Sequence, residues 1–252
     1  MALKDWGYVD FAEPFTRFYA HGLIIKDGAK MSKSRGNVVN PDEYITKYGA
    51  DTMRLYLMFL GPTDAQGDFR DSGIEGMQRW INRLWRLVKP QDTNMPAEID
   101  SALNKLVKKA TENIEARKYN LVIAGMMEFI NLVEKIQVAL PASAWKTFLL
   151  VLAPFAPHMA EELWYGTLHQ TTSIHTQAWP IYDPSKTVNT RAIIVVQVNG
   201  KVKERLEMES DRAGEQEHIK QLALESAKVV TILNGASYRT IFVPGKLINF
   251  VT

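Results

Sequence analysis

Apolar side chains recur at helical spacing through most of residues 74–169, and this periodicity constrains the fold more than any other feature of the chain. The first periodic segment runs from Ile74 to Val88, and its expected apolar face comprises Met77, Trp80, Ile81, Leu84, Trp85 and Val88. The preceding residues 61–68 are rich in turn-forming residues, so this helix follows a break in the chain. A helix with so broad an apolar face must pack against other helices.

The helical pattern continues beyond a polar linker. Four more helices are expected, over about residues 100–117, 120–136, 142–152 and 158–169. Asp100 or Ser101 is the expected cap of the first, and Pro141 fits the first turn of the third. The second is apolar on nearly all sides and therefore buried. The whole region is predicted to form a helical bundle.

The composition shifts at a Pro-containing connector, Trp179 to Ser185, after which β-branched residues dominate. Asn199-Gly200 is a strong hairpin signal between two such runs. The pattern predicts a helix over 215–228 and strands over 192–198, 201–208, 229–233, 238–243 and 247–251. The tail should therefore be a small α/β module.

Composition excludes several classes of protein. Lys and Arg total 30 and Asp and Glu total 28, so any nucleic-acid contact must be a local patch. The chain has no cysteine and its five histidines lack metal-ligand spacing, so no metal site is expected. The longest apolar stretch, Phe148 to Ala156, is too short to span a bilayer, and Met1 to Asp10 lacks a signal-peptide pattern. A cytoplasmic protein is expected.

The octapeptide Lys-Met-Ser-Lys-Ser-Arg-Gly-Asn at residues 30–37 carries the chemistry. A short apolar run ending in Asp27-Gly28 precedes it, typical of a strand entering a turn. Asn40-Pro41 follows it and indicates a helix start, with Asn40 or Asp42 as the cap. The octapeptide is therefore predicted to be a mobile loop between a strand and a helix, with two lysines suited to gripping a polyphosphate.

This loop resembles the KMSKS signature of the class I aminoacyl-tRNA synthetases. The residues that follow also match: a Pro-Asp-Glu helix start, and then Gly49-Ala50-Asp51-Thr52 and Arg54, where Gly49 can end one helix and Asp51 can cap the next. The resemblance implies ATP, with Mg2+, as a substrate bound by Lys30, Met31, Ser32, Lys33 and Ser34. The ammonium groups of Lys33 and Lys30 would act mainly in the transition state, by stabilising charge on the α-phosphate and the departing pyrophosphate.

Within this class the chain is most similar to the bacterial leucyl-tRNA synthetases. The similarity lies in Glu13-Pro14-Phe15, in Asp71–Gly76 followed by Trp80–Arg86, and in Val196–Lys201 and Val243–Asn249 of the tail. The related valyl and isoleucyl enzymes usually end in coiled-coil or zinc-bearing appendages, which are not seen here. The resemblance implies an enzyme that activates leucine with ATP and transfers it to tRNA(Leu).

The resemblance also implies a multidomain, mainly α-helical fold. Residues 1–68 would be the end of a catalytic domain, with the KMSKS loop and stem-contact helices. Residues 69–183 would form a helical anticodon-binding domain, and residues 184–252 a small α/β domain that binds tRNA.

One departure from the family is important. The second ATP-binding element, His-x-Gly-His, is absent, as are most of the nucleotide-binding fold and the editing domain. We therefore expect the last third of a synthetase, inactive alone, whose missing part belongs to the same chain or to a separate subunit. Two alternatives remain: part of a valyl, isoleucyl or methionyl enzyme, or a stand-alone tRNA-binding module without catalysis.

Two groups of basic residues are candidates for contact with tRNA phosphates. Arg79, Arg83 and Arg86 fall on one stripe of the first bundle helix, a pattern that also occurs on solvated helix faces. Lys201, Lys203 and Lys246 lie in the α/β tail.

Overall fold

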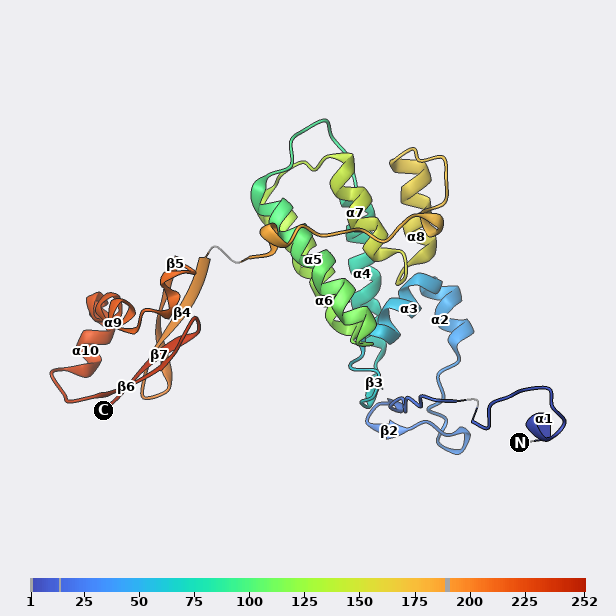
Figure 1. Cartoon of the computed structure of the whole chain (residues 1–252), viewed down its shortest axis with the longest axis horizontal. Coiled ribbons are helices and arrows are strands. Elements are labelled where there is room, and N and C mark those ends of the chain that lie inside the picture. The colour runs from blue at the N-terminus through green and yellow to red at the C-terminus, as the bar shows by residue number, and fades with distance from the viewer. Residues whose placement is uncertain (1, 14, 189–190) are drawn as a thin grey trace. The chain divides into compact units, whose positions relative to one another are not determined.

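The computed structural model describes residues 2–13, 15–188 and 191–252 (Figure 1). The chain divides into two compact units, residues 1–187 and 188–252. Helices dominate the first unit, and the second is a four-stranded sheet with helices. The prediction of a mainly α-helical multidomain chain is confirmed at this level. Pro14, part of one motif quoted above, lies outside the described residues.

The first unit opens with the part that carries the octapeptide. Its elements are α1 (Ala2–Asp5), β1 (Ile24–Lys26), β2 (Ala29–Lys30), a 3-10 helix (Lys33–Arg35), α2 (Pro41–Tyr48), α3 (Ala50–Phe59) and β3 (Gly67–Phe69). The strand order is β2-β1-β3, with β1 antiparallel to β2 and parallel to β3. Asp27 and Gly28 join β1 to β2 with φ of 53° and 74°, as a two-residue hairpin turn requires. The predicted strand and turn are confirmed.

The caps of α2 and α3 test two predictions. Asn40 caps α2, because its Oδ1 accepts the N–H of Asp42 at 3.2 Å. The prediction that Asp51 caps α3 is wrong. Gly49 occupies that cap position, and Asp51 is already inside the first turn. Its carboxylate lies against another helix instead, where Oδ2 accepts the N–H of Met159 at 2.7 Å.

The bundle follows β3 in the chain. Its elements are α4 (Asp71–Leu87), α5 (Ala97–Glu115), α6 (Tyr119–Ile136), α7 (Ala142–Leu152), α8 (Pro157–Glu162), a π-helical turn (Leu163–Thr167) and 3-10 turns (Ile174–Thr176 and Pro184–Thr187). All predicted helices exist. α5 starts at Ala97, earlier than Asp100 or Ser101, because Pro96 already occupies the cap position. The last predicted helix ends as α8 at Glu162, where the π-helical turn takes over.

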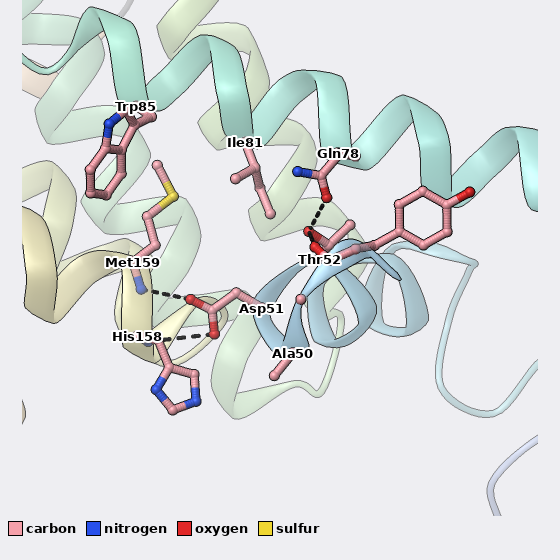
Figure 2. A pocket seen from close by; sticks show the side chains of 10 residues that line it. Ala50, Asp51, Thr52, Gln78, Ile81, Trp85, His158 and Met159 are labelled. Atoms are coloured by element: carbon pink, nitrogen blue, oxygen red, sulfur yellow. Dashed lines mark hydrogen bonds between the residues drawn. The ribbon is translucent and has the colours of Figure 1, made fainter. Parts of the chain in front are cut away.

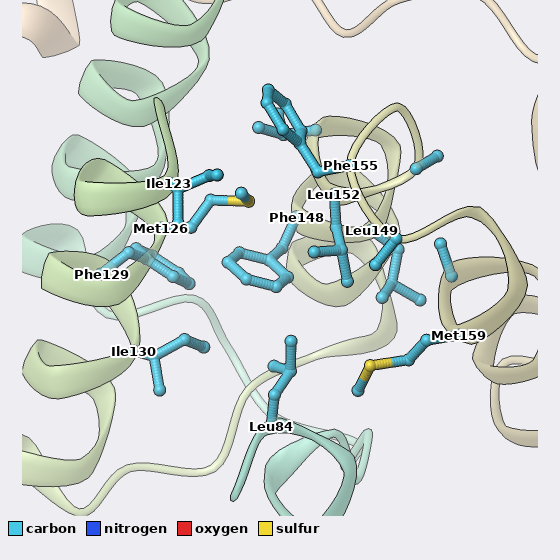
Figure 3. Packing of buried hydrophobic residues seen from close by; sticks show 14 of the residues in the cluster. Leu84, Ile123, Met126, Phe129, Ile130, Phe148, Leu149, Leu152, Phe155 and Met159 are labelled. Carbon is cyan, nitrogen blue, oxygen red and sulfur yellow. The ribbon is translucent and has the colours of Figure 1, made fainter. Parts of the chain in front are cut away.

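The bundle helices share one apolar core. Figure 3 shows Phe148 of α7 directed toward Phe129 of α6, and their rings stack with centroids 5.5 Å apart. Met53 and Leu55 of α3 belong to the same core, so α3 packs with the bundle. Trp85, predicted to be part of the apolar face, is 47% exposed, because it lines an open recess between helices.

The second unit is a mixed sheet covered by short helices. Its elements are β4 (Arg191–Val198), β5 (Lys201–Glu209), a 3-10 turn (Arg212–Gly214), α9 (Gln216–Glu225), α10 (Ala227–Leu233), β6 (Arg239–Val243) and β7 (Leu247–Val251). The strand order is β5-β4-β7-β6, with β4 and β7 parallel. Asn199 and Gly200 form the predicted hairpin turn with φ of 50° and 76°.

One predicted strand in this unit, residues 229–233, is wrong, because the segment is helix α10. Val229 and Leu233, four residues apart, are both buried, whereas Val230 is half exposed. This is the burial pattern of a helix face and not of a strand. The β-branched composition of the segment favoured the wrong element.

The described ranges contain neither a helix suited to a membrane nor a cluster of side chains suited to a metal ion. No helix there has the length and apolar content needed to cross a bilayer. No three acidic, histidine or cysteine side chains gather there in a way that could hold a metal ion.

Candidate functional site

The octapeptide, predicted to be a loop between a strand and a helix, forms a short hydrogen-bonded turn that contains a 3-10 helix. Lys30 ends β2, and Lys33 begins the 3-10 helix. The Oγ of Ser32 caps this helix by accepting the N–H of Arg35 at 3.3 Å, and Gly36 closes it in the left-handed region with φ of 66°. Both lysine side chains are exposed. The turn therefore presents two ammonium groups to solvent from a hydrogen-bonded backbone.

The side chain of Asn37 closes the base of this turn. Its Oδ1 accepts the N–H of Ser32 at 2.9 Å, and its Nδ2 donates to the carbonyl of Lys30 at 3.2 Å. One amide therefore joins the entry and exit of the turn. Met31 adds a second anchor, since it packs partly buried against the bundle core. Sequence reasoning included Asn37 in the motif but assigned it no role.

The serines of the turn are also engaged. The hydroxyls of Ser32 and Ser34 lie 3.1 Å apart and hydrogen-bond to each other. The five residues predicted to bind ATP, Lys30 to Ser34, are thus brought together on one turn. Lys30, Lys33 and Ser34 are exposed, whereas Met31 packs against the core.

The arginine stripe on α4 is only partly available to a ligand. Arg79 and Arg86 are exposed. Arg83 is engaged with α6, because its Nε lies 3.2 Å from Glu134 Oε1 and its guanidinium also donates to Asn131. A bound guanidinium is less able to reach an external phosphate. The structure therefore gives Arg83 a packing contact that the periodicity did not reveal.

The three lysines of the second unit lie on either side of β4, with Lys201 and Lys203 in β5 and Lys246 directly before β7. Lys201 pairs with Val198 at the hairpin end of β4, whereas the carbonyl of Lys246 bonds Val195 on the other side of that strand. Lys203 is the extra residue of a β-bulge in β5. Lys201 and Lys246 are exposed and Lys203 is half-buried.

A recess of about 360 Å³ lies where the starts of α3 and α8 meet α4 (Figure 2). On one side of the recess, the carboxylate of Asp51 joins α3 to α8, because it accepts the N–H groups of Met159, at 2.7 Å, and of His158, at 3.4 Å. On the other side, Thr52 Oγ1 donates to Gln78 Oε1 at 2.8 Å. Sequence reasoning missed this recess, because residues that are far apart in the chain line it: Asp51 and Met159 are 108 positions apart. These bonds join the helices next to the octapeptide to the bundle.

Two segments of the chain match known protein families. Residues 8–70 match the family described as tRNA synthetases class I (I, L, M and V). Residues 97–219 match the anticodon-binding domain of tRNA ligase, and this match extends into the second unit. A lysine-bearing signature turn followed by this helical domain defines the class as class I tRNA synthetases.

Individual relatives indicate which family within the class I tRNA synthetases the chain is similar to. Leucine–tRNA ligase of Dehalococcoides mccartyi strain 195 is 42% identical, and the match covers 99% of this chain and 32% of the relative. The Rubrobacter xylanophilus enzyme of the same name is 43% identical, with 99% and 31% covered. The chain belongs to the leucine–tRNA ligase family, of which it matches the C-terminal part.

A solved structure agrees with this assignment. The LeuRS agnB2 of Agrobacterium radiobacter K84, in a ternary complex with tRNA and LeuAMS, has a TM-score of 0.70 at 29% identity. The match covers 99% of this chain and 34% of that one. The chain thus spans about a third of the length of the relatives it matches. The leucine family is favoured over the valyl, isoleucyl and methionyl alternatives.

Proposed function

We propose that this chain supplies the KMSKS turn and the tRNA-binding part of a cytoplasmic enzyme that activates leucine with ATP and transfers it to tRNA(Leu). The observation that carries the proposal is the turn itself. Lys30 and Lys33 extend from a backbone closed by Asn37, within the region that matches the class I synthetases. ATP, with Mg2+, is the substrate that such a pair of ammonium groups suits.

The proposed chemistry follows from charge. Attack of the leucine carboxylate on the α-phosphate of ATP places negative charge on the phosphate and on the leaving pyrophosphate. The ammonium of Lys33, with that of Lys30 nearby in the turn, stabilises this charge most in the transition state. The hydrogen bonds of Ser32 and Asn37 hold the backbone beforehand, so less reorganisation is needed during the reaction.

For tRNA, we propose phosphate contacts on both units. Arg79 and Arg86 are exposed cations of α4, which directly precedes residues 97–219, the segment that matches the anticodon-binding family. Lys201, Lys203 and Lys246 offer further positive charge on the second unit. Arg83 contributes to this surface mainly by holding α4 against α6. Residues 1–68, 69–183 and 184–252 would then be the catalytic end, the anticodon-binding domain and the C-terminal tRNA-binding domain.

The proposed partner in catalysis is the remaining two thirds of the enzyme, with its nucleotide fold and editing domain. The N-terminal segment exposes large apolar side chains, among them Trp6 at 72%, Phe15 at 80% and Phe18 at 92%. Exposed apolar residues concentrated in one segment commonly mark an interaction surface. We propose that the rest of the catalytic domain covers them, from the same chain or from a separate subunit.

The test is leucine-dependent exchange of pyrophosphate into ATP. The isolated chain should show none, because it lacks the rest of the nucleotide site. In the full-length enzyme, Lys33→Ala should lower the exchange rate by about 10²-fold with little change in leucine binding. Lys47→Ala, which removes an exposed lysine of α2, is the matched control and should leave the rate unchanged.

Two outcomes would contradict the proposal. Exchange by the isolated chain would show that it holds a complete site. Equal losses of rate and of leucine affinity in Lys33→Ala would contradict the transition-state role. The second candidate function, a tRNA-binding module without catalysis, rests on the family match of residues 97–219. This function would be favoured if the isolated chain bound tRNA and Lys33→Ala left the rate of pyrophosphate exchange by the full-length protein unchanged.

A further inference from the structure

Three side chains from distant parts of the sequence meet beside the KMSKS turn. Lys26 is in β1, the first strand of the hairpin that leads into the turn, and Tyr44 is in α2, the helix that follows it. Asp71 is the first residue of α4, the helix that carries the arginine stripe. The group therefore connects both flanks of the turn to the start of the bundle.

The phenol of Tyr44 is the centre of this group. Its hydroxyl accepts a hydrogen bond from Lys26 Nζ at 3.2 Å and donates one to Asp71 Oδ1 at 2.5 Å. Lys26 Nζ also lies 3.7 Å from Asp71 Oδ2, which completes a triangle of contacts. Each residue touches the other two, so none of the three elements can move without breaking at least one contact.

Packing keeps the triangle partly shielded from water. The Tyr44 ring meets Phe69 of β3 edge to face, with centroids 4.9 Å apart. The ammonium of Lys26 lies 5.8 Å from the centres of both rings, and its side chain is 18% exposed. The hydrogen bond to Tyr44 raises the pKa of Lys26, and burial raises the pKa of Tyr44. At neutral pH the directions of both hydrogen bonds are thus fixed.

We propose that Lys26, Tyr44 and Asp71 form a positioning network that fixes the β1–β2 hairpin, which leads into the KMSKS turn, relative to the first turn of α4. Tyr44 is its central positioning residue, because it bonds both Lys26 and Asp71. The network gives the bundle helix a direct connection to the strand that ends four residues before Lys30. The consequence for catalysis rests on the proposed function; the structural consequence does not.

Tyr48 provides a matched control. It lies one turn further along α2, and its ring stacks on that of Tyr44 with centroids 6.3 Å apart. Its hydroxyl donates to Glu75 Oε1 of α4 at 3.4 Å. Tyr44→Phe and Tyr48→Phe each remove one hydroxyl from the same helix and keep the ring. Only the first breaks the connection to β1.

The first measurement is amide hydrogen exchange in the 252-residue chain, which requires no substrate. Tyr44→Phe should speed exchange of the amides of Ser32, Arg35 and Gly36 about fivefold, the factor expected when a typical hydrogen bond is lost. Tyr48→Phe should leave them within about twofold of the wild type. Loop amides that exchange no faster in Tyr44→Phe than in Tyr48→Phe would overturn the proposal.

A second variant protects the test against misfolding. Asp71→Asn keeps a side chain of the same shape but removes the charge that both partners use, and the carboxylate is 59% exposed, so the fold should survive. It should raise exchange in the same amides. If Tyr44→Phe fails to fold, unchanged loop exchange in Asp71→Asn alone would refute the network.

The second measurement separates positioning from general stability. In the full-length enzyme, Tyr44→Phe should lower kcat for pyrophosphate exchange about fivefold and leave the KM for leucine unchanged, whereas Tyr48→Phe should change neither. Equal kcat losses in the two variants would count against the network. If the wild-type enzyme showed no exchange at all, the proposed function would fail while the amide result would still decide the network.

Discussion

The carboxylate of Asp51 is expected to contribute strongly to the stability of the first unit. It is 8% exposed and accepts the N–H groups of His158 and Met159, at the start of a helix 107 residues away in sequence. Replacing a helix cap with alanine costs about 0.5–2 kcal/mol, and leaving a buried N–H without an acceptor costs about 1–3 kcal/mol. These ranges describe the same loss and are not summed. Asp51→Ala should therefore reduce the unfolding free energy by about 2 kcal/mol.

Tryptophan fluorescence during urea unfolding measures this effect in the right part of the chain. All six tryptophans lie at or before residue 179, within the first unit, so the second unit does not contribute. At a slope of about 2–3 kcal/mol per molar urea, a loss of about 2 kcal/mol lowers the midpoint by about 0.8 M. Asp51→Asn, which keeps one acceptor oxygen, should show about half of that shift.

The control is Asp42→Ala. Asp42 is exposed in the first turn of α2, where its charge gains only the field of the helix start, about 0.3–1 kcal/mol. If Asp51→Ala shifted the midpoint no more than Asp42→Ala does, the bridge from α3 to α8 would not stabilise the unit. A changed slope with an unchanged midpoint would also refute the reasoning, because it would indicate altered cooperativity instead of a lost contact.

Gly49→Ala should destabilise the first unit by about 1–3 kcal/mol in the same urea assay, because Gly49 has φ of 88° and ψ of 155°, a region that is essentially restricted to glycine. Gly61→Ala, where an added Cβ also meets nothing and no such φ occurs, should change stability far less; equal effects would rule out the backbone explanation. The double variant Arg79→Ala/Arg86→Ala should reduce the slope of log affinity for tRNA against log salt by about 1.5, measured by filter binding. The exposed, uncharged Asn82 of the same helix provides the control as Asn82→Ala, and a slope unchanged by the double variant would remove both arginines from the interface. Asp68 accepts the N–H of Gly28 and bonds Arg70, which lowers its pKa. A folded-state pKa below the unfolded value means that its stabilising effect is present above 3.8 and is lost as the pH falls through the folded pKa. The protection factor of the Gly28 amide, which is its intrinsic exchange rate divided by the observed rate at the same pH, should therefore fall at acid pH in the wild type but stay constant in Asp68→Asn.

Some elements could be predicted from the sequence because their residue types strongly favour one local conformation. Asp27-Gly28 and Asn199-Gly200 both form hairpin turns with positive φ at each position, as their residue types favour. Helix α7 occupies the predicted residues 142–152, because a proline precedes it and apolar residues fill it. The octapeptide was likewise recognisable from its own residues and flanks.

The remaining features depend on contacts that local sequence does not encode. Asp51 has a typical capping side chain, but its partners lie more than 100 residues away. Arg83 matches its neighbours in the stripe and differs from them only because Glu134 is within reach. Segment 229–233 has strand-like composition, and burial of Val229 and Leu233 on one side favours a helix. In each case tertiary packing overrides or redirects the local preference.

The parallel pairing of β1 with β3 also has a consequence for folding. Ile24 pairs with Gly67 and Lys26 with Phe69, so this ladder closes over more than 40 residues that include the KMSKS turn, α2 and α3. Closing so long a segment costs chain entropy before its contacts form, so such pairings are slow. The antiparallel hairpin of β1 and β2 is local and can form first. The turn can thus acquire its shape early, and it reaches its place in the protein only when α2 and α3 have packed and β3 has paired with β1.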